Sequence, residues 1–204
     1  MLIVVRHGQT EANAQGLLLG RNDPPLDSIG RGQASAVAAA LRPLGRDARV
    51  VSSPLRRAFE TAQFIAAEGN VDIDERWIEL DYGTLEGTRV ADVPEDTWRE
   101  WRADPDFTPG GGESLAALGT RVAIACDELI IEAAEHDVIV VTHVSPVKAA
   151  TAWALGVDPH ARETVTWSMY VAPGSITRIA PRRFGRVLAS FNETPWSAGR
   201  AIGG

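Results

Sequence analysis

The sequence predicts an α/β fold of three layers, a sandwich in which helices flank both faces of a mostly parallel central sheet. Three apolar runs, rich in β-branched residues, lack the alternation of half-exposed strands and are typical of strands buried on both faces: residues 2–5, 49–51 and 138–142. Alanine-rich segments with helical spacing separate or follow them, at residues 29–44, 54–67 and 114–135. Because strands and helices alternate along the chain, we expect the strands to be parallel.

Two further parts of the sequence predict a lid or insertion and additional strands at the edge of the sheet. Residues 89–112 carry three prolines and a triple glycine around a short helical piece with Trp98 and Trp101, which predicts a lid or insertion. Residues 1–204 are expected to form one domain. In the C-terminal third, short segments bounded by turn residues are expected to form hairpin strands that extend or edge the sheet: residues 167–172, 175–180 and 186–191.

Composition and charge limit the classes of function. The net charge of -7 and the pI near 5.1 disfavour nucleic acid and anionic membrane surfaces as partners. A small anionic substrate stays compatible, because a few arginines converging in one cleft create a local positive potential. Cys126 is the only cysteine, so an intrachain disulfide and a cysteine metal cluster are excluded. Its apolar helical surroundings favour a packed core thiol over a nucleophile, and the cysteine usage favours a cytoplasmic setting.

Two of the four histidines share an informative position. His7 and His143 each directly follow a predicted buried strand. In open α/β sheets the ligand crevice lies beyond the carboxyl ends of the strands, so these two side chains can converge although they are far apart in sequence. His136 follows a long predicted helix and His160 lies in a predicted turn, so both are expected at the surface.

The residues around His7 are suited to a tetrahedral dianion. Arg6 supplies a fixed cation, Gly8 a closely approachable backbone and Asn13 an amide side chain. A second strand end is followed by a helix with Pro54 in its first turn, and Arg56 and Arg57 come next. A helix N-terminus itself favours anions, so one of these arginines is expected to complete an anion site. Taken alone, His7 could equally well only cap its strand.

Across most of its length the chain resembles the histidine phosphatase superfamily, in the branch that also contains cofactor-dependent phosphoglycerate mutases, which implies a phosphoglycerate mutase-like fold. A lone Arg-His-Gly would be a weak signal, whereas many motifs in the family's order are a strong one. The motifs that carry the resemblance lie at residues 6–10, 20–26, 53–58, 79–83, 109–114 and 141–143.

The resemblance implies roles for individual residues. His7 is implied as the nucleophile, with Arg6, Arg57 and His143 holding the phosphoryl group during transfer. Glu79 is implied as the proton donor to the leaving group. Asn13 is implied as a further phosphate contact. In the family the binding arginine directly precedes an alanine, as Arg57 precedes Ala58, so Arg56 is expected at the cleft rim or in solvent.

These roles have a physical rationale. A neutral imidazole can attack phosphorus, so His7 must be unprotonated, and the nearby cations Arg6 and Arg57 are expected to lower its pKa. Glu79 must start protonated to serve the departing alkoxide. By composition alone Glu79 would be interpreted as one solvated carboxylate of an acidic run, and only the family pattern reverses that. No metal and no cofactor are expected, because cationic side chains replace a divalent ion.

Two departures from the family pattern affect the predicted substrate site. Val144 follows the second histidine where the family usually has glycine, so we expect the backbone there to approach the substrate differently. Leu85 takes the place of a common aromatic residue beside the leaving group. Arg21 is equally compatible with an ordinary loop cation and with a contact at the edge of the substrate.

We therefore predict a metal-independent phosphomonoesterase acting on a small phosphorylated metabolite through a phosphohistidine. The compact length favours hydrolysis over phosphoglycerate mutase activity, which is the alternative. A noncatalytic module that binds phosphorylated ligands is a further alternative, disfavoured because His7, Glu79 and His143 are all present. The substrate is not predicted, because specificity resides in the lid and crevice rim. An edge strand in the C-terminal third is compatible with a homodimer.

Overall fold

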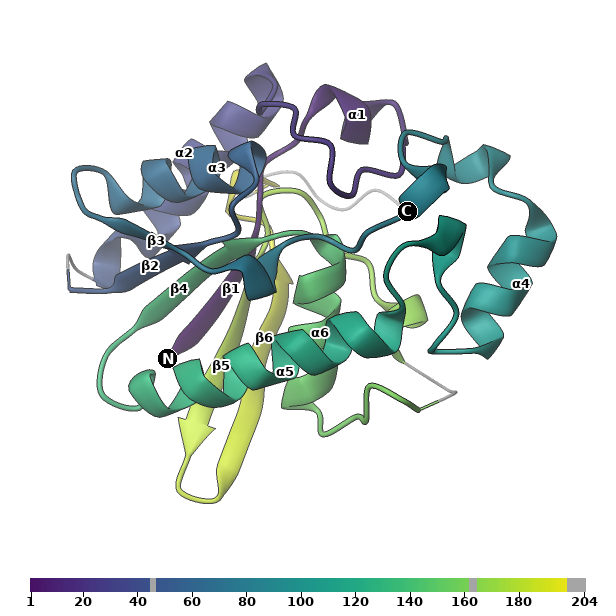
Figure 1. The fold of residues 1–204 in the computed structure, drawn as a ribbon. Helices are drawn as coiled ribbons and strands as arrows, with labels where there is room; N and C mark the ends of the chain where they lie inside the picture. Colours follow the sequence, from purple (N-terminus) through teal and green to yellow (C-terminus); the bar gives the residue numbers. More distant parts are fainter. Residues whose placement is uncertain (45–46, 162–164, 198–204) are drawn as a thin grey trace.

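The computed structural model describes residues 1–44, 47–161 and 165–197 and contains one six-stranded sheet with the order β3-β2-β4-β1-β5-β6 (Figure 1). The four strands β3, β2, β4 and β1 are parallel, β5 is antiparallel to β1, and β6 is antiparallel to β5. The predicted mostly parallel α/β sheet with a C-terminal hairpin at its edge is confirmed. The strands are β1 (Leu2–Arg6), β2 (Arg49–Ser52), β3 (Val71–Ile73), β4 (Val138–Thr142), β5 (Ile176–Arg182) and β6 (Gly185–Glu193).

Helices cover both faces of this sheet (Figure 1). On one face lie α2 and α3, whereas α5 and α6 cover the other, and α4 lies beyond the end of α5. None of the helices in the described part of the chain is long and apolar enough to cross a membrane. The helices are α1 (Glu11–Ala14), α2 (Ser28–Leu41), α3 (Arg56–Ala66), α4 (Glu95–Ala103), α5 (Leu115–Glu132) and α6 (Val144–Ala154).

The residues of β1 explain why its sequence does not alternate. Ile3 and Val5 are buried against α2 and α3, whereas Leu2 and Val4 are buried in the larger cluster with α5 and α6. A strand with helices on both faces needs apolar side chains at every position. Cys126 is fully buried within the α5 cluster, where burial raises the pKa of its thiol, as predicted for a packed core cysteine.

One predicted strand is wrong. Residues 167–172 start in a 3₁₀ turn (Val165–Ser168) and continue as an irregular segment. Side chains occupy its backbone groups: the Val171 carbonyl accepts from Arg6 and the Ala172 amide donates to Asn192, so these groups are used outside a strand ladder. The prediction for Pro54 is also wrong, since α3 begins two residues later, at Arg56, with Leu55 as its N-cap.

Candidate active site

The register of two central strands brings the two candidate histidines together. In the β1–β4 pair Arg6 lies opposite Thr142, so His7 and His143 follow at neighbouring positions, and the His7 amide donates to the Thr142 carbonyl at 2.9 Å. The two imidazole rings meet edge to face with their centroids 5.0 Å apart. Both side chains are buried, at 2% and 0% exposure. The expected convergence at the carboxyl edge of the sheet is thus present in the structure.

The imidazole of His7 is oriented by a hydrogen bond on each nitrogen. Nδ1 lies 2.6 Å from the Gly8 carbonyl oxygen, which can only accept, so Nδ1 carries the proton. Nε2 is then the unprotonated nitrogen, and Arg57 Nε donates to it at 3.2 Å. Burial lowers the pKa of His7 well below its usual value, and the charges of Arg57 and Arg6 lower it further. The sequence predicts the effect of the two arginines but not that of burial, which is the largest cause of the lowered pKa.

Arg57 is held rigidly at the N-terminal turn of α3. Its Nη1 donates to the Asn22 carbonyl at 2.7 Å and its Nη2 to the Gly20 carbonyl at 2.8 Å, and the side chain is fully buried. Burial lowers its pKa to about 10, so the guanidinium stays charged at neutral pH. Arg56, by contrast, is exposed and pairs with Glu60 at 2.7 Å. The choice of Arg57 over Arg56 as the inward-facing arginine agrees with this arrangement.

Arg6 and His143 each keep one buried nitrogen without a partner among the described residues. Arg6 Nη1 donates to the Val171 carbonyl at 2.6 Å, but Arg6 Nε has no such partner. His143 Nε2 lies 2.7 Å from Ser53 Oγ, while its Nδ1 is unpaired. Burial, followed by the charge of Arg57, lowers the pKa of His143 well below its usual value. Buried polar atoms without partners are uncommon and point to a ligand that supplies them.

Glu79 is fixed by the apolar residues on either side of it. Trp77 and Leu80 are almost fully buried in the core, and Thr142 Oγ1 donates to the Trp77 carbonyl at 2.5 Å, which ties this segment to the end of β4. The Glu79 carboxylate, 2% exposed, accepts the Leu80 amide at 2.7 Å and the Ser145 amide at 3.4 Å. The solvated carboxylate of the composition-based alternative is therefore excluded.

We call Arg6, His7, Arg57, Glu79 and His143 the polar cluster. They come from four places in the sequence and lie at the carboxyl ends of strands or in the segments that follow. Two imidazoles and two guanidinium cations in a buried space can bind a phosphoryl group and present one unprotonated imidazole nitrogen to it. Within the described residues, no group of three or more His, Cys, Asp or Glu could hold a metal ion.

The three predicted substrate contacts lie at different places. Asn13 ends a capping box, in which its Oδ1 accepts from the Thr10 amide at 3.2 Å. Arg21 is partly exposed and lies 3.6 Å from the Glu113 carboxylate. Val144 is the first residue of α6, directly after His143. His136 and His160 are surface residues, as predicted, with side chains 43% and 58% exposed.

Two glycines act by close packing of backbones. A Cβ at Gly8 would lie 2.3 Å from the Gly30 carbonyl oxygen of α2, so Gly8 lets α2 approach the residue after His7. A Cβ at Gly112 would lie 2.1 Å from the Asp81 carbonyl oxygen, which explains part of the triple glycine. The sequence predicts that Gly8 leaves the backbone open to an anion; the structure adds a second reason for glycine here, the close approach of α2.

Sequence reasoning missed the support given by Ser53 and Thr142. Ser53 contacts His143, and the Thr142 hydroxyl holds the Glu79 segment. Ser53 directly follows β2 and Thr142 is the last residue of β4, so each lies at the carboxyl end of a buried strand. A serine or threonine at the end of a buried strand could have indicated this support, because a buried hydroxyl group needs a hydrogen-bond partner.

A buried pair of imidazoles with two arginines and a carboxylate, at the carboxyl edge of a parallel sheet, defines an α/β protein built to hold an anion. Comparison with known proteins agrees: the model of the histidine phosphatase superfamily (branch 1) matches residues 2–194. The chain belongs to this family.

Individual relatives of this chain include phosphatases and a probable mutase. The phosphoserine phosphatase 1 of Hydrogenobacter thermophilus is 37% identical, over 77% of this chain and 77% of its own length. A probable phosphoglycerate mutase of Yersinia enterocolitica is 30% identical, over 97% and 87%. The crystal structure of an Entamoeba histolytica phosphoserine phosphatase with phosphoserine has a TM-score of 0.86, 29% identity and coverage of 96% and 98%. Several mycobacterial relatives are 38% identical, but the match spans only 44% of their length.

Proposed function

We propose that this chain is a phosphatase that hydrolyses monoesters of small phosphorylated metabolites through a phosphohistidine at His7. The observation that carries the proposal is the state of this imidazole: Nδ1 is tied to the Gly8 carbonyl, and Nε2 is unprotonated beside the guanidinium of Arg57. Its lowered pKa keeps Nε2 available as a nucleophile at neutral and mildly acidic pH. The phosphatases among its relatives support the same reaction class.

In the first step Nε2 of His7 attacks phosphorus and the bond from phosphorus to the ester oxygen breaks. Glu79 enters the step protonated and gives its proton to the departing alkoxide, which leaves as an alcohol. Arg6, Arg57 and His143 stabilise the charge on the three oxygens that stay on phosphorus. The unpaired Arg6 Nε and His143 Nδ1 are suited to this, because a phosphoryl oxygen would satisfy them.

In the second step water attacks the phosphohistidine. Glu79, now a carboxylate, takes one proton from that water, the bond from phosphorus to Nε2 breaks, and inorganic phosphate is released with His7 restored. Arg6 and Arg57 supply the positive charge that a divalent ion provides in other phosphatases, so we propose that turnover needs no metal. Turnover should therefore be unchanged by a chelator.

The decisive experiment traps the intermediate. Enzyme mixed with a phosphomonoester and quenched in alkaline denaturant should gain the mass of one phosphoryl group on the peptide that contains His7, and mild acid should remove it. The His7→Ala variant, with an unchanged melting temperature, should gain none. Rapid turnover without a trapped phosphoryl group, or with one on another residue, would contradict the mechanism. A folded protein that binds phosphate esters but turns over none would favour the noncatalytic alternative.

Phosphoglycerate mutase activity stays the second candidate because of the Yersinia enterocolitica relative. A mutase must keep its phosphohistidine from water until a second acceptor oxygen arrives. Phosphatase and mutase activity are distinguished by supplying 3-phosphoglycerate and measuring free phosphate and isomerised product in the same reaction. We expect phosphate release to dominate; efficient isomerisation with negligible phosphate release would overturn this choice.

We also propose that residues 89–112 act as a lid, that Asn13 is a further phosphate contact, and that Arg21 and Val144 contact the substrate. Arg21 and Glu113 form an ion pair at the base of the proposed lid, and the Glu113 amide donates to the Asp81 carbonyl at 2.9 Å. Lid closure should protect the peptide bonds of residues 89–112 from proteolysis when inorganic phosphate or vanadate is bound. Equal cleavage with and without these ions would remove the lid from the proposal.

A further inference from the structure

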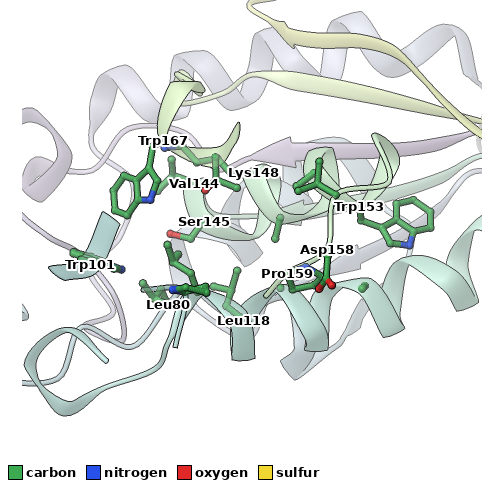
Figure 2. A pocket seen from close by; sticks show the side chains of 18 of the residues that line it. Leu80, Trp101, Leu118, Val144, Ser145, Lys148, Trp153, Asp158, Pro159 and Trp167 are labelled. Carbon is green, nitrogen blue, oxygen red and sulfur yellow. The ribbon is translucent and has the colours of Figure 1, made fainter. Parts of the chain in front are cut away.

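A cavity of about 200 Å³ lies beside the polar cluster, between α5 and α6 (Figure 2). Trp101 and Trp167 stand at one end of it, and Trp153, Asp158 and Pro159 stand at the other. We call this cavity the apolar pocket. Its volume is large enough for several carbon atoms beyond a phosphate ester.

Aromatic and aliphatic side chains form the walls of the apolar pocket. Trp98 and Trp101 are stacked with their centroids 5.2 Å apart, and Trp167 packs edge-on against Trp101 at 5.5 Å. Leu80 and Leu118 line the side opposite α6 (Figure 2). Interlocked aromatic rings of this kind make a stiff apolar wall. Such a wall favours apolar groups, because a polar group entering it loses its water without replacement.

The apolar pocket is continuous with the polar cluster through two chain segments. Leu80 directly follows Glu79, and Val144 and Ser145 directly follow His143. The Ser145 amide donates to the Glu79 carboxylate at 3.4 Å, so a pocket residue touches the proposed proton donor. A leaving group protonated by Glu79 therefore departs on the side where the pocket begins.

Lys148 is the one cation among the residues that line this pocket within the described chain. It lies one helical turn beyond Val144 on the same face of α6, and in the described residues its ammonium group has no hydrogen-bond or ion-pair partner. Burial lowers its pKa and the charge of Arg6 lowers it further, while the charge of Glu79 opposes this shift. Lys148 is half-buried, so its ammonium group can donate a hydrogen bond to an acceptor on a ligand in the pocket.

We infer that the apolar pocket binds the alcohol part of the substrate, and that the preferred substrates are phosphate monoesters of apolar alcohols with an acceptor or carboxylate close to the ester carbon. This inference rests on the proposed function. The apolar body lies between α5 and α6 against the tryptophans, and the acceptor receives a hydrogen bond from Lys148. The serine part of phosphoserine, the ligand of the Entamoeba histolytica structure, would leave most of the 200 Å³ unfilled.

A series of primary alkyl phosphates tests the inference, because ethyl, butyl and hexyl phosphate share one leaving-group chemistry. Each methylene that enters an apolar site contributes roughly a fourfold gain in kcat/KM, from about 0.8 kcal/mol per buried methylene. We expect kcat/KM to rise at least about tenfold from ethyl to hexyl phosphate, and hexyl phosphate to exceed phosphoserine. A flat series, or a preference for phosphoserine, would overturn the inference.

Two substitutions on α5 form a matched pair for this series. Ala123 lines the apolar pocket, whereas Ala117 is exposed on the same helix. Ala123→Leu adds the same atoms inside the pocket that Ala117→Leu adds outside it. We expect Ala123→Leu to lower kcat/KM for hexyl phosphate about tenfold while leaving ethyl phosphate within about twofold, and Ala117→Leu to change neither. Equal losses on both esters with Ala123→Leu would assign the cavity no part in substrate selection.

Lys148→Met removes the ammonium group and keeps an unbranched apolar stem. Compared on hexyl phosphate and on its analogue with a carboxylate beside the ester carbon, this variant should lose about tenfold only on the analogue. If the unchanged protein and Lys148→Met hydrolyse both esters at similar rates, the proposed hydrogen bond from Lys148 to the substrate is wrong. The failures are distinguishable: if no ester is hydrolysed at all the proposed function fails, whereas His7-dependent hydrolysis without chain-length preference ends only the pocket assignment.

Discussion

In the polar cluster His7 and Arg57 are tied to backbone carbonyl oxygens, whereas the neighbouring apolar pocket is built from side chains of helices and connecting segments. Gly8, Gly20 and Asn22 fix His7 and Arg57 through their carbonyl oxygens. The pocket walls depend instead on the packing of Trp98, Trp101 and their neighbours. The polar cluster therefore suits a reaction that a whole family shares, whereas the apolar pocket suits a choice of substrate that differs from one chain to another.

The backbone ties also explain where change is tolerated. A side chain that lines the pocket can be exchanged at the cost of local packing. A residue such as Arg57 cannot, because its two carbonyl partners and the imidazole of His7 accept one particular geometry. Substitutions in the two regions should therefore affect different kinetic parameters, with the largest effects on the side of the polar cluster.

The largest expected effect is that of Glu79→Gln on esters with poor leaving groups. The amide cannot donate the proton that the alkoxide needs, so turnover of alkyl phosphates should fall about 10² to 10⁴-fold. Turnover of 4-nitrophenyl phosphate, whose leaving group departs without a proton, should change much less. Steady-state rates over a series of leaving groups measure the difference. Parallel losses on all esters would show that Glu79 acts in some other way.

Arg57→Lys should come next. Lysine keeps the charge but cannot donate at once to Gly20, Asn22 and His7 in the fork geometry of the guanidinium. We expect kcat/KM to fall about 10² to 10³-fold with little change in which ester is preferred. Arg56→Lys, at the exposed neighbouring position, is the control and should stay within about twofold. A strong loss with Arg56→Lys would indicate that both arginines reach the substrate.

Two glycines on the polar-cluster side of the sheet should have opposite effects on stability when they are replaced by alanine. Gly8→Ala forces a Cβ against the Gly30 backbone and should destabilise the fold by about 1 to 3 kcal/mol. Gly32 lies in α2, where a Cβ meets nothing within 4 Å, so Gly32→Ala should stabilise by about 0.5 to 1 kcal/mol. Urea unfolding of both variants gives the comparison. Opposite signs are expected; a loss of equal size in both would rule out the backbone contact as the cause.

The last expected effect concerns the dependence of stability on pH. His7 and His143 have lowered pKa values in the fold, so below about pH 6.5 the unfolded chain takes up protons that the folded chain excludes. Stability should fall as the pH drops from 6.5, by up to about 1.4 kcal/mol per pH unit for each histidine, and be unaffected by them above it. In His7→Gln this slope should be smaller, whereas in the surface variant His136→Gln it should be kept. An unchanged slope in His7→Gln would mean that its imidazole is not the group excluded.

Most of the polar cluster could be placed from the sequence because four of its five residues, all but Glu79, are attached to a strong local signal. Buried strand patterns placed His7 and His143 at strand ends, and an alanine-rich helix placed Arg57 in its first turn. Glu79 had no such signal: its segment is a 3₁₀ turn and an extended stretch, anchored by Trp77 and Leu80 through contacts distant in sequence. Its place depended on the family pattern.

Other elements escaped prediction for physical reasons. Strand β3 has three residues with a charged residue in the middle, too short a pattern to detect. Helix α6 begins directly after His143 with valine, serine and proline, which carry no apolar spacing of their own. The irregular segment at residues 167–172 has strand-like composition, but Arg6 and Asn192 take its backbone groups. The apolar pocket depends on how α5 meets α6, which no local pattern encodes.

The place of β1 between β4 and β5 has a consequence for how the chain folds. Strand β1 must wait for partners that lie more than 130 residues further along the chain, on both of its edges. Pairing β1 with β4 and β5 closes long loops and so costs conformational entropy before the central strand pairs form. The topology therefore favours slow, late folding. Because His7 and His143 are brought together by that same pairing, a partly synthesised chain carries no assembled site, and chemistry begins only once the sheet has closed around its first strand.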